Sequence, residues 1–388
     1  MLQDIRQHID LVDGSIAWAK EHGKESFPCN TFKDWRRRLK RIYAALEEKC
    51  SVAAYGESQV GKSYLMSSLL SSPNSPFVIT NGGKAYSFID DINPSGGNNA
   101  KIESTGVVTR FTLDGGNPLM RDYVRVRNLS VVDIILLIAD SYYNDIKIDP
   151  DNVLRYDDIN QALEEMSALW SKRVAVQDKI DEDDIRDIVD YLHDVTGNAA
   201  GAVNQSNFGK VVAPVIKYVP YDKWVDVFGL LWNRNKELNH LFGVLINEYK
   251  KLCFETDVYV PFTAVLRDKG TLLKIEWLDT VCGIHSDTGH DEIYTDVYDA
   301  RGNLLARDFH KGNLSALAAE LTFELPAELA EDRRFLHKLD LLDFPGARSR
   351  EKYKEREIGS VLPKMLRRGK VAYLFNKYSR SLRISSVL

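Results

Sequence analysis

One glycine-rich stretch has the residue types and spacing of a phosphate-binding loop. Residues 56–63 read Gly-Glu-Ser-Gln-Val-Gly-Lys-Ser, the pattern G-x-x-x-x-G-K-S, and they follow a short apolar run at 51–55. Glycine lets such a loop curl tightly enough for successive backbone N–H groups to point at one phosphate chain. Lys62 would reach the β and γ phosphates, and the Ser63 hydroxyl would hold Mg²⁺. The stretch therefore predicts a nucleoside triphosphate site.

The segment after the loop favours the same interpretation. Residues 64–70 have helical character, so the loop would lie at a helix N-terminus, where the macrodipole favours anions. The alternative is a glycine-rich turn that binds nothing. The residues expected to contact the nucleotide are Gly56, Glu57, Ser58, Gln59, Val60, Gly61, Lys62, Ser63 and Tyr64.

A triphosphatase also needs groups for the metal and the γ phosphate, and two later segments offer them. Asp343 and Gly346 form a D-x-x-G arrangement after an apolar run; the carboxylate can hold a metal-bound water, and the glycine N–H can face the γ phosphate. Thr109, where a loop enters a strand, could give its hydroxyl and carbonyl to Mg²⁺ and the attacking water. Each segment alone is also ordinary turn or strand sequence. Together they favour a switch-type site with catalytic Lys62, Thr109 and Gly346, and metal ligands Ser63, Thr109 and Asp343.

Longer strings carry a resemblance to known families. The string G-V-V-T-R at 106–110 resembles the switch I signature of dynamin-family GTPases, and D-F-P-G at 343–346 resembles their D-L-P-G element. From about residue 51 to the C-terminus, the chain is more closely similar to the SrfC-like family of bacterial virulence factors, through I-N-P-S-G-G, L-D-F-P-G-A-R-S-R and R-R-G-K-V-A-Y-L-F. This resemblance implies an α/β P-loop fold and turnover of GTP or ATP with Mg²⁺.

The chain departs from the dynamin pattern in ways that leave the nucleotide open. Gln59 replaces the serine that in dynamins helps to place a monovalent cation. Residues 376–379 read Asn-Lys-Tyr-Ser, but Ser379 lacks the carboxylate that accepts from a guanine base. We therefore expect the base-recognition element after residue 388, in a longer protein. GTP is the favoured substrate; an ATPase of the same fold, or a nucleotide-binding scaffold with little turnover in a secretion, virulence or defence assembly, are the alternatives.

The composition of the chain limits the functional classes that need to be considered. The 388 residues are 44% hydrophobic and 28% charged, which is ordinary for a folded protein of two or three units. A net charge of −5 argues against nucleic-acid binding. The four cysteines lack C-x-x-C spacing, which favours a reducing cytoplasm over a disulfide framework. The longest strongly apolar run, 131–139, is too short to span a bilayer, so any membrane contact would be peripheral.

Periodicity predicts an α/β P-loop NTPase core interrupted by a large insert. Residues 1–50 form N-terminal helices, 51–130 the first part of the core, 131–255 a helical insert, 256–330 a β-rich insert with its own small sheet or hairpins, and 331–388 the truncated second part. Within the last part, 371–375 reads as a buried strand. In the N-terminal segment, the helix expected at 31–49 carries six cations. We favour a solvent-exposed face for these cations over a contact with acidic lipid or a partner.

Three further features are weighed against simpler interpretations. The polar stretch 285–292 could hold a divalent metal, although a surface turn is favoured because zinc spacing is absent. Arg110, Arg348 and Arg350 could stabilise charge on a phosphate or meet a partner subunit, although solvated arginines are more common. No general base is evident, so a second protomer could complete the nucleotide site in a homodimer; other partner proteins are not indicated.

Overall fold

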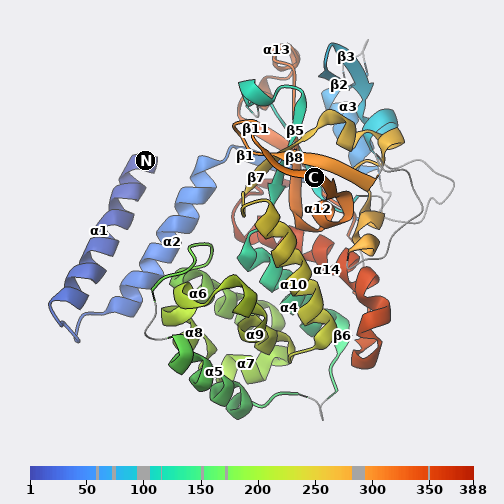
Figure 1. Ribbon diagram of the computed structural model, residues 1–388. Coiled ribbons are helices and arrows are strands. Elements are labelled where there is room, and N and C mark those ends of the chain that lie inside the picture. The colour runs from blue at the N-terminus through green and yellow to red at the C-terminus, as the bar shows by residue number, and fades with distance from the viewer. Residues whose placement is uncertain are drawn as a thin grey trace.

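A nine-stranded sheet of mixed direction organises the chain, with helices packed around it (Figure 1). The computed structural model describes residues 1–57, 61–71, 76–93, 105–114, 116–149, 153–170, 174–281, 293–347 and 350–388. The strand order is β13-β1-β11-β4-β10-β5-β7-β8-β9. In chain order the strands are β1 (Cys50–Ala54), β4 (Val108–Thr112), β5 (Tyr123–Asn128), β7 (Asp257–Pro261), β8 (Tyr294–Tyr298), β9 (Leu304–His310), β10 (Ala318–Glu324), β11 (Leu339–Asp343) and β13 (Ser386–Val387).

The centre of the sheet brings distant parts of the sequence side by side. β1 pairs in parallel with β11 on one side and β13 on the other. β11 pairs antiparallel with β4, and β4 pairs in parallel with β10. β10 then pairs antiparallel with β5, and β5 with β7. β1 and β11 therefore end at the same edge of the sheet, where β4 begins.

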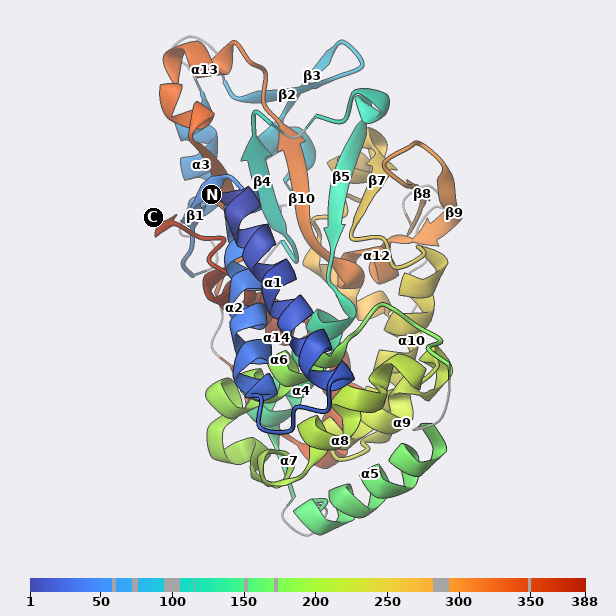
Figure 2. The same ribbon diagram turned by 90° about the vertical axis from the view of Figure 1, so that its left-hand side faces the viewer.

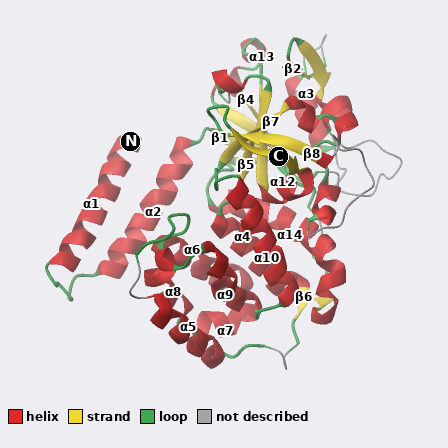
Figure 3. Cartoon of the chain, in the orientation of Figure 1, coloured by secondary structure: helices red, strands yellow, loops and turns green. Residues whose placement is uncertain are grey.

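The helices form three groups, which Figures 2 and 3 separate. An N-terminal hairpin consists of α1 (Leu2–Glu21) and α2 (Cys29–Glu47). Next to the sheet lie α3 (Lys62–Leu70), α4 (Val131–Asp145), α12 (Lys311–Leu317), α13 (Leu329–Asp332) and α14 (Ile358–Arg380). Between β5 and β7 come α5 (Tyr156–Trp170), α6 (Glu182–Tyr191), α7 (Gly201–Gln205), α8 (Phe208–Val215), α9 (Trp224–Phe228) and α10 (Lys236–Lys251). Two small ladders join β2 (Val78–Asn81) to β3 (Lys84–Ser87), and β6 (Ile146–Lys147) to β12 (Tyr353–Lys354).

Helix α4 has both a capping motif at its start and extensive burial. Ser130 caps it: the Ser130 hydroxyl accepts from the Asp133 N–H, and the Asp133 carboxylate accepts from the Ser130 N–H at 2.7 Å. Such a capping box satisfies two backbone donors at the helix start. The helix is buried almost all round because it contacts both α14 and α10. Within the described ranges, no helix is long and apolar enough to cross a bilayer.

Two sequence predictions about secondary structure are wrong. The run 371–375, predicted as a strand, lies inside α14. Val371, Tyr373 and Leu374 are buried in a helix that packs on α4, and this packing outweighs the β propensity of the short run. The strands at 256–330 form no separate small sheet, because β7, β8, β9 and β10 all belong to the nine-stranded sheet; the alternative of a hairpin is confirmed for β8 and β9. Residues 376–379 also lie in α14, as a helix rather than a base-reading loop.

The close packing of α14 on α4 predicts the effect of one small substitution. A Cβ at Gly369 would lie 1.9 Å from Ser141 Oγ and 3.1 Å from Ser141 Cβ, and Ser141 is buried. We expect Gly369→Ala to lower the free energy of unfolding by about 1–3 kcal/mol, since overpacking exceeds the gain in helix propensity. Urea denaturation measures the free energy of unfolding of the variant and of the parent protein. Gly359→Ala on the same helix is the control, because its Cβ would make only an ordinary contact, 3.5 Å from Glu237. Equal losses of stability in the two variants would contradict the overpacking.

Candidate functional site

The glycine-rich loop and the D-x-x-G segment meet at one edge of the sheet. β1 runs into the loop and α3 follows it, while β11 ends beside β1 with Asp343 paired to Ala54. The Ser63 hydroxyl, in the first turn of α3, donates to Asp343 Oδ2 at 2.5 Å. These two residues are 280 positions apart in the sequence. The fold therefore joins the two metal-binding candidates that the sequence placed in separate motifs.

The backbone continues this contact beyond the strands. The Phe344 N–H donates to the Ala54 carbonyl at 3.2 Å, and the Ala347 N–H donates to the Gly56 carbonyl at 2.8 Å. Glu57 and Ala347 form an isolated parallel bridge. Gly346 is buried between these two contacts. The D-x-x-G segment thus runs alongside the first residues of the loop, and its glycine lies at the loop as predicted.

The ends of the loop have the conformations that a tight curl requires. Gly61 has a φ of 93°, in the left-handed region that glycine adopts at little cost, and it is the N-cap of α3. The Lys62 ammonium donates to the Glu57 carbonyl at 2.7 Å and to the Gly56 carbonyl at 3.2 Å. Lys62 therefore lies across the loop that carries it. Ser58, Gln59 and Val60, which were also predicted to contact the nucleotide, lie outside the described residues.

Thr109 lies next to Asp343 but inside the sheet. It is buried on β4, directly opposite Asp343 on β11 and beside Leu321 on β10. Directly opposite side chains in an antiparallel pair have Cβ atoms about 4.5–5.5 Å apart. Tyr64, in contrast, has 72% of its surface exposed and is not enclosed by the site. The structure brings together the predicted Ser63, Thr109, Asp343 and Gly346, and leaves Tyr64 at the surface.

A family model matches residues 22–388, nearly the whole chain. The chain belongs to the family described as "Putative bacterial virulence factor". A search of the curated proteins finds no match. Membership in this family confirms the resemblance to bacterial virulence factors, and it leaves the resemblance to dynamin-family GTPases untested.

In this virulence-factor family member, Arg110 points away from the candidate site. Successive side chains of a strand face opposite sides, so Thr109 and Phe111 face the side of α3 while Arg110 faces the other. Phe111 accordingly packs edge-on against Phe88 with ring centroids 5.0 Å apart. Arg110 Nε donates to Glu320 Oε1 at 2.7 Å, and Arg110 Nη1 donates to Asp340 Oδ2 at 2.8 Å. Arg110 is therefore a buried structural cation and does not reach the loop.

The ion pair strongly favours the charged form of its carboxylate. Burial by itself would raise the pKa of Glu320, but the charges of Arg110 and Arg127 and a hydrogen bond from Arg110 outweigh it and lower this pKa to about 2. The Tyr378 hydroxyl also donates to Glu320 Oε2 at 2.8 Å. Every contact of Glu320 thus stabilises the anion.

Of the other weighed residues, Arg350 takes no part in the site. Arg350 pairs with Asp140 and Asp145 of α4, at 3.3 Å from Asp145 Oδ1. Arg348 and the stretch 285–292 lie outside the described residues. Across the ranges that the structure describes, no group of three or more His, Cys, Asp or Glu side chains is placed to hold a metal ion. The metal hypothesis therefore depends on Ser63, Thr109 and Asp343.

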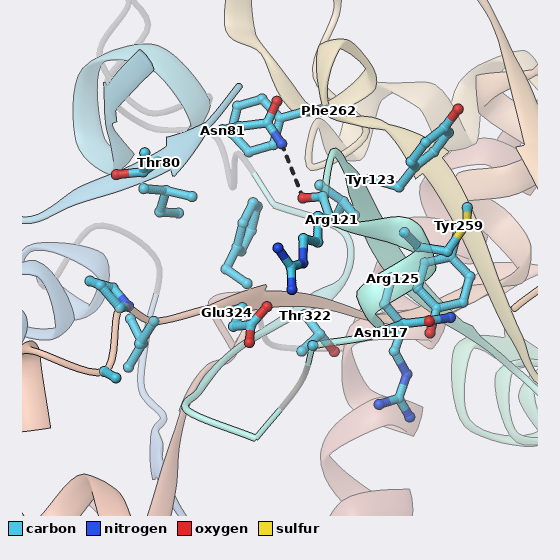
Figure 4. Close-up of a pocket in the computed structure, with 18 residues that line it drawn as sticks. Thr80, Asn81, Asn117, Arg121, Tyr123, Arg125, Tyr259, Phe262, Thr322 and Glu324 are labelled. Atoms are coloured by element: carbon cyan, nitrogen blue, oxygen red, sulfur yellow. Dashed lines mark hydrogen bonds between the residues drawn. The ribbon is translucent and has the colours of Figure 1, made fainter. Parts of the chain in front are cut away.

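A second hollow, of about 300 Å³, opens at the opposite edge of the sheet, where β10 ends and β5 begins (Figure 4). Arg121 and Glu324 extend into it, and Tyr259 and Phe262 form part of its wall. Its lining residues come from separate segments between 79 and 327 with no recognisable spacing. Sequence reasoning missed this hollow because only the strand pairing assembles it.

Proposed function

We propose that this protein is a Mg²⁺-dependent P-loop nucleoside triphosphatase, with GTP as the favoured substrate. The observation that carries the proposal is the hydrogen bond of 2.5 Å between Ser63 and Asp343. In a phosphate-binding loop of this pattern the serine holds Mg²⁺, and an aspartate at the end of a neighbouring strand holds the same ion. A turn that binds nothing needs no such match between its serine and a carboxylate 280 positions away.

The position of the site in the sheet supports the same conclusion. Ligands of open α/β sheets bind outside the carboxyl ends of the strands, and the loop leaves the carboxyl end of β1 beside that of β11. α3 begins at Lys62, so its unpaired N–H groups and its dipole face the loop. Both features favour an anion at this edge.

The donor set also suits the metal. Mg²⁺ prefers oxygen ligands and keeps several waters, and the Ser63 hydroxyl and the Asp343 carboxylate are two such oxygens within one hydrogen bond of each other. Thr109 lies directly opposite Asp343 in the sheet, so its hydroxyl would be a further oxygen ligand for the ion. Bound Mg²⁺ would neutralise charge on the phosphates.

The roles of the remaining residues follow from their places around the loop. Lys62 would exchange the carbonyls of Gly56 and Glu57 for β and γ phosphate oxygens, which are stronger acceptors for an ammonium. Gly346 would offer its N–H to the γ phosphate. The attacking water would be oriented by Thr109 and backbone groups, with a second protomer as the source of any further catalytic group.

Substitution of Lys62 tests this proposal. We expect Lys62→Ala to lower GTP hydrolysis with Mg²⁺ by roughly a hundredfold, since it removes a cation that stabilises transition-state charge. The control is Lys210→Ala, which removes an exposed lysine of α8, in the helical part between β5 and β7. Phosphate release is measured for both variants and the parent protein. Equal turnover by the parent and Lys62→Ala would remove Lys62 from the mechanism.

A second measurement identifies which nucleotide the protein binds. The Asn-Lys-Tyr-Ser string at 376–379 lies in α14, so it gives no reason to prefer guanine, and an ATPase of the same fold is the second candidate. Calorimetric titration with GTP and with ATP in the presence of Mg²⁺ separates the two. Binding of either without hydrolysis would instead favour a nucleotide-binding scaffold in a virulence-associated assembly. A hydrolysis rate per protein molecule that rises with protein concentration would support a homodimer across the site.

A further inference from the structure

The basic face of α2 is covered by an acidic stripe on α6. Figures 1 and 2 show α2 beside the helical part of the molecule, with α6 as its neighbour. Lys33 and Arg41 approach Glu182 and Asp187 at 2.5 and 2.6 Å, respectively. The further contacts join Arg36 to Asp183 at 2.6 Å, Lys40 to Asp183 at 2.8 Å, Arg37 to Asp187 at 2.8 Å, and Arg37 to Asp190. The prediction of a solvated face is therefore wrong for Lys33, Arg36 and Arg37, which are largely covered, whereas Lys40 and Arg41 are paired but stay exposed.

Spacing along both helices explains the match. On α2 the paired cations recur at three- and four-residue intervals, and on α6 the acids 183, 187 and 190 do the same, with Glu182 next to Asp183. Residues so spaced share one face of a helix. The opposite face of α6 carries the buried Ile185 and Ile188, which hold it in the helical part. Thus α6 is anchored by apolar packing and presents its charges to α2.

Apolar packing contributes little to the attachment of the hairpin. Arg37 is the one residue of α2 that is buried, and α1 buries only Ile16 and Ala19, in a hairpin whose two helices pack on each other. Leu11 and Trp35 are largely exposed. At the base of the hairpin, Glu48 pairs with Arg127 at 2.6 Å and with Arg383 at 3.0 Å. Ion pairs thus hold both the side and the base of the hairpin, and at the base the chain also continues directly into β1.

Ion pairs that remain partly exposed are weak and depend on salt. Such pairs contribute little each, and the Debye length falls from about 10 Å at 0.1 M salt to about 3 Å at 1 M. An attachment built from several such pairs can therefore open under conditions that leave an apolar core intact. Glu48, the C-cap of α2, has an extended backbone and precedes β1 by two residues, so it provides a hinge.

We propose that the α1–α2 hairpin is a detachable arm, held against α6 by an ionic clasp formed by Lys33, Arg36, Arg37, Lys40 and Arg41 with Glu182, Asp183, Asp187 and Asp190. The clasp opens when its charges are screened or when another polyanionic surface competes for α2, and opening uncovers the basic face. The base at Glu48 stays attached. This arm is independent of the nucleotide chemistry proposed above.

Distance measurements with charge reversal test the clasp. Spin labels are attached at Thr31 of α2 and at Asp178, before α6, after the four native cysteines are replaced by serine. We expect a narrow distance distribution at about 0.05 M salt and a broad, longer one at about 1 M salt. Arg36→Glu with Arg37→Glu should broaden the distribution at low salt, and adding Asp183→Arg with Asp187→Arg should restore it.

The control reverses charges on the same hairpin outside the clasp. Lys20→Glu with Lys24→Glu changes the net charge equally at two exposed positions and should leave the distribution narrow. Circular dichroism checks that each variant is folded. A distribution in the parent protein that does not respond to salt would overturn the proposal even if a reversal variant failed to fold. Broadening in Arg36→Glu with Arg37→Glu that the exchanged charges do not reverse would also overturn it.

Discussion

Replacement of Arg110 by methionine is expected to lower the free energy of unfolding by about 3–5 kcal/mol, because it removes the cation that donates hydrogen bonds to two buried carboxylates. Glu320 and Asp340 have only 1% and 5% of their side-chain surfaces exposed. Methionine fills much of the space of the arginine stem but supplies no donor. Chemical denaturation measures the loss.

A neighbouring arginine provides the matched control for this change. Arg125 on β5 pairs with Asp257 at 2.9 Å, but both side chains are 25–33% exposed, so Arg125→Met should cost no more than about 1 kcal/mol. Adding Glu320→Gln to Arg110→Met should recover part of the lost stability, since the unpaired charge is then removed. If the two methionine variants lose equal stability, burial of the Arg110 pair is not the cause.

The same ion pair predicts a dependence on pH. The pKa of Glu320 in the folded protein is about 2, below its ordinary value of 4.5. The stability that this carboxylate contributes is therefore fully present above about pH 4.5, and it is lost as the pH falls toward 2. In Arg110→Met this part of the acid dependence should shrink. Denaturation at a series of pH values compares the two slopes.

Replacement of Lys370 by methionine is the second large change, and it should stabilise the protein. Lys370 is fully buried on α14, and its ammonium donates to the Ser315 carbonyl. Burial lowers the pKa of this lysine from its ordinary value of 10.5 to about 7. At pH 7 the unfolded chain carries the charge at no cost. We expect Lys370→Met to raise the free energy of unfolding by about 2–4 kcal/mol, less than the full shift because the Ser315 carbonyl loses its donor.

The sign of the pH effect distinguishes removal of the buried charge from better apolar packing as the cause of the stabilisation. Because the folded-state pKa lies below the unfolded one, the parent protein should gain stability as the pH rises from about 7 toward 10.5, where the unfolded chain loses its extra proton. Lys370→Met should lack this rise. Lys364→Met, at an exposed position of the same helix, should change stability by less than about 0.5 kcal/mol. A parent protein whose stability falls over this range would contradict the assignment.

The sequence by itself determined the features that rest on local rules. The pattern at 56–63 placed a glycine at 61, where the backbone has a positive φ. The alternating residues at 123–128 form β5, and Ser130 caps α4, as local sequence rules require. Alternation and capping involve residues a few positions apart, so a single segment contains all the information that they need.

Only the tertiary structure decided which distant segments meet. No local pattern could predict that the acids of α6 would cover the cations of α2, or that Arg110 of β4 would pair with Glu320 of β10. It also predicted a strand at 371–375, where contact with α4 stabilises a helix. The contact between Ser63 and Asp343 is of this kind. Each motif predicted one of the two residues, and the parallel pairing of β1 with β11 brings them together. A sheet that is buried on both faces selects its strand neighbours by packing rather than by order along the chain.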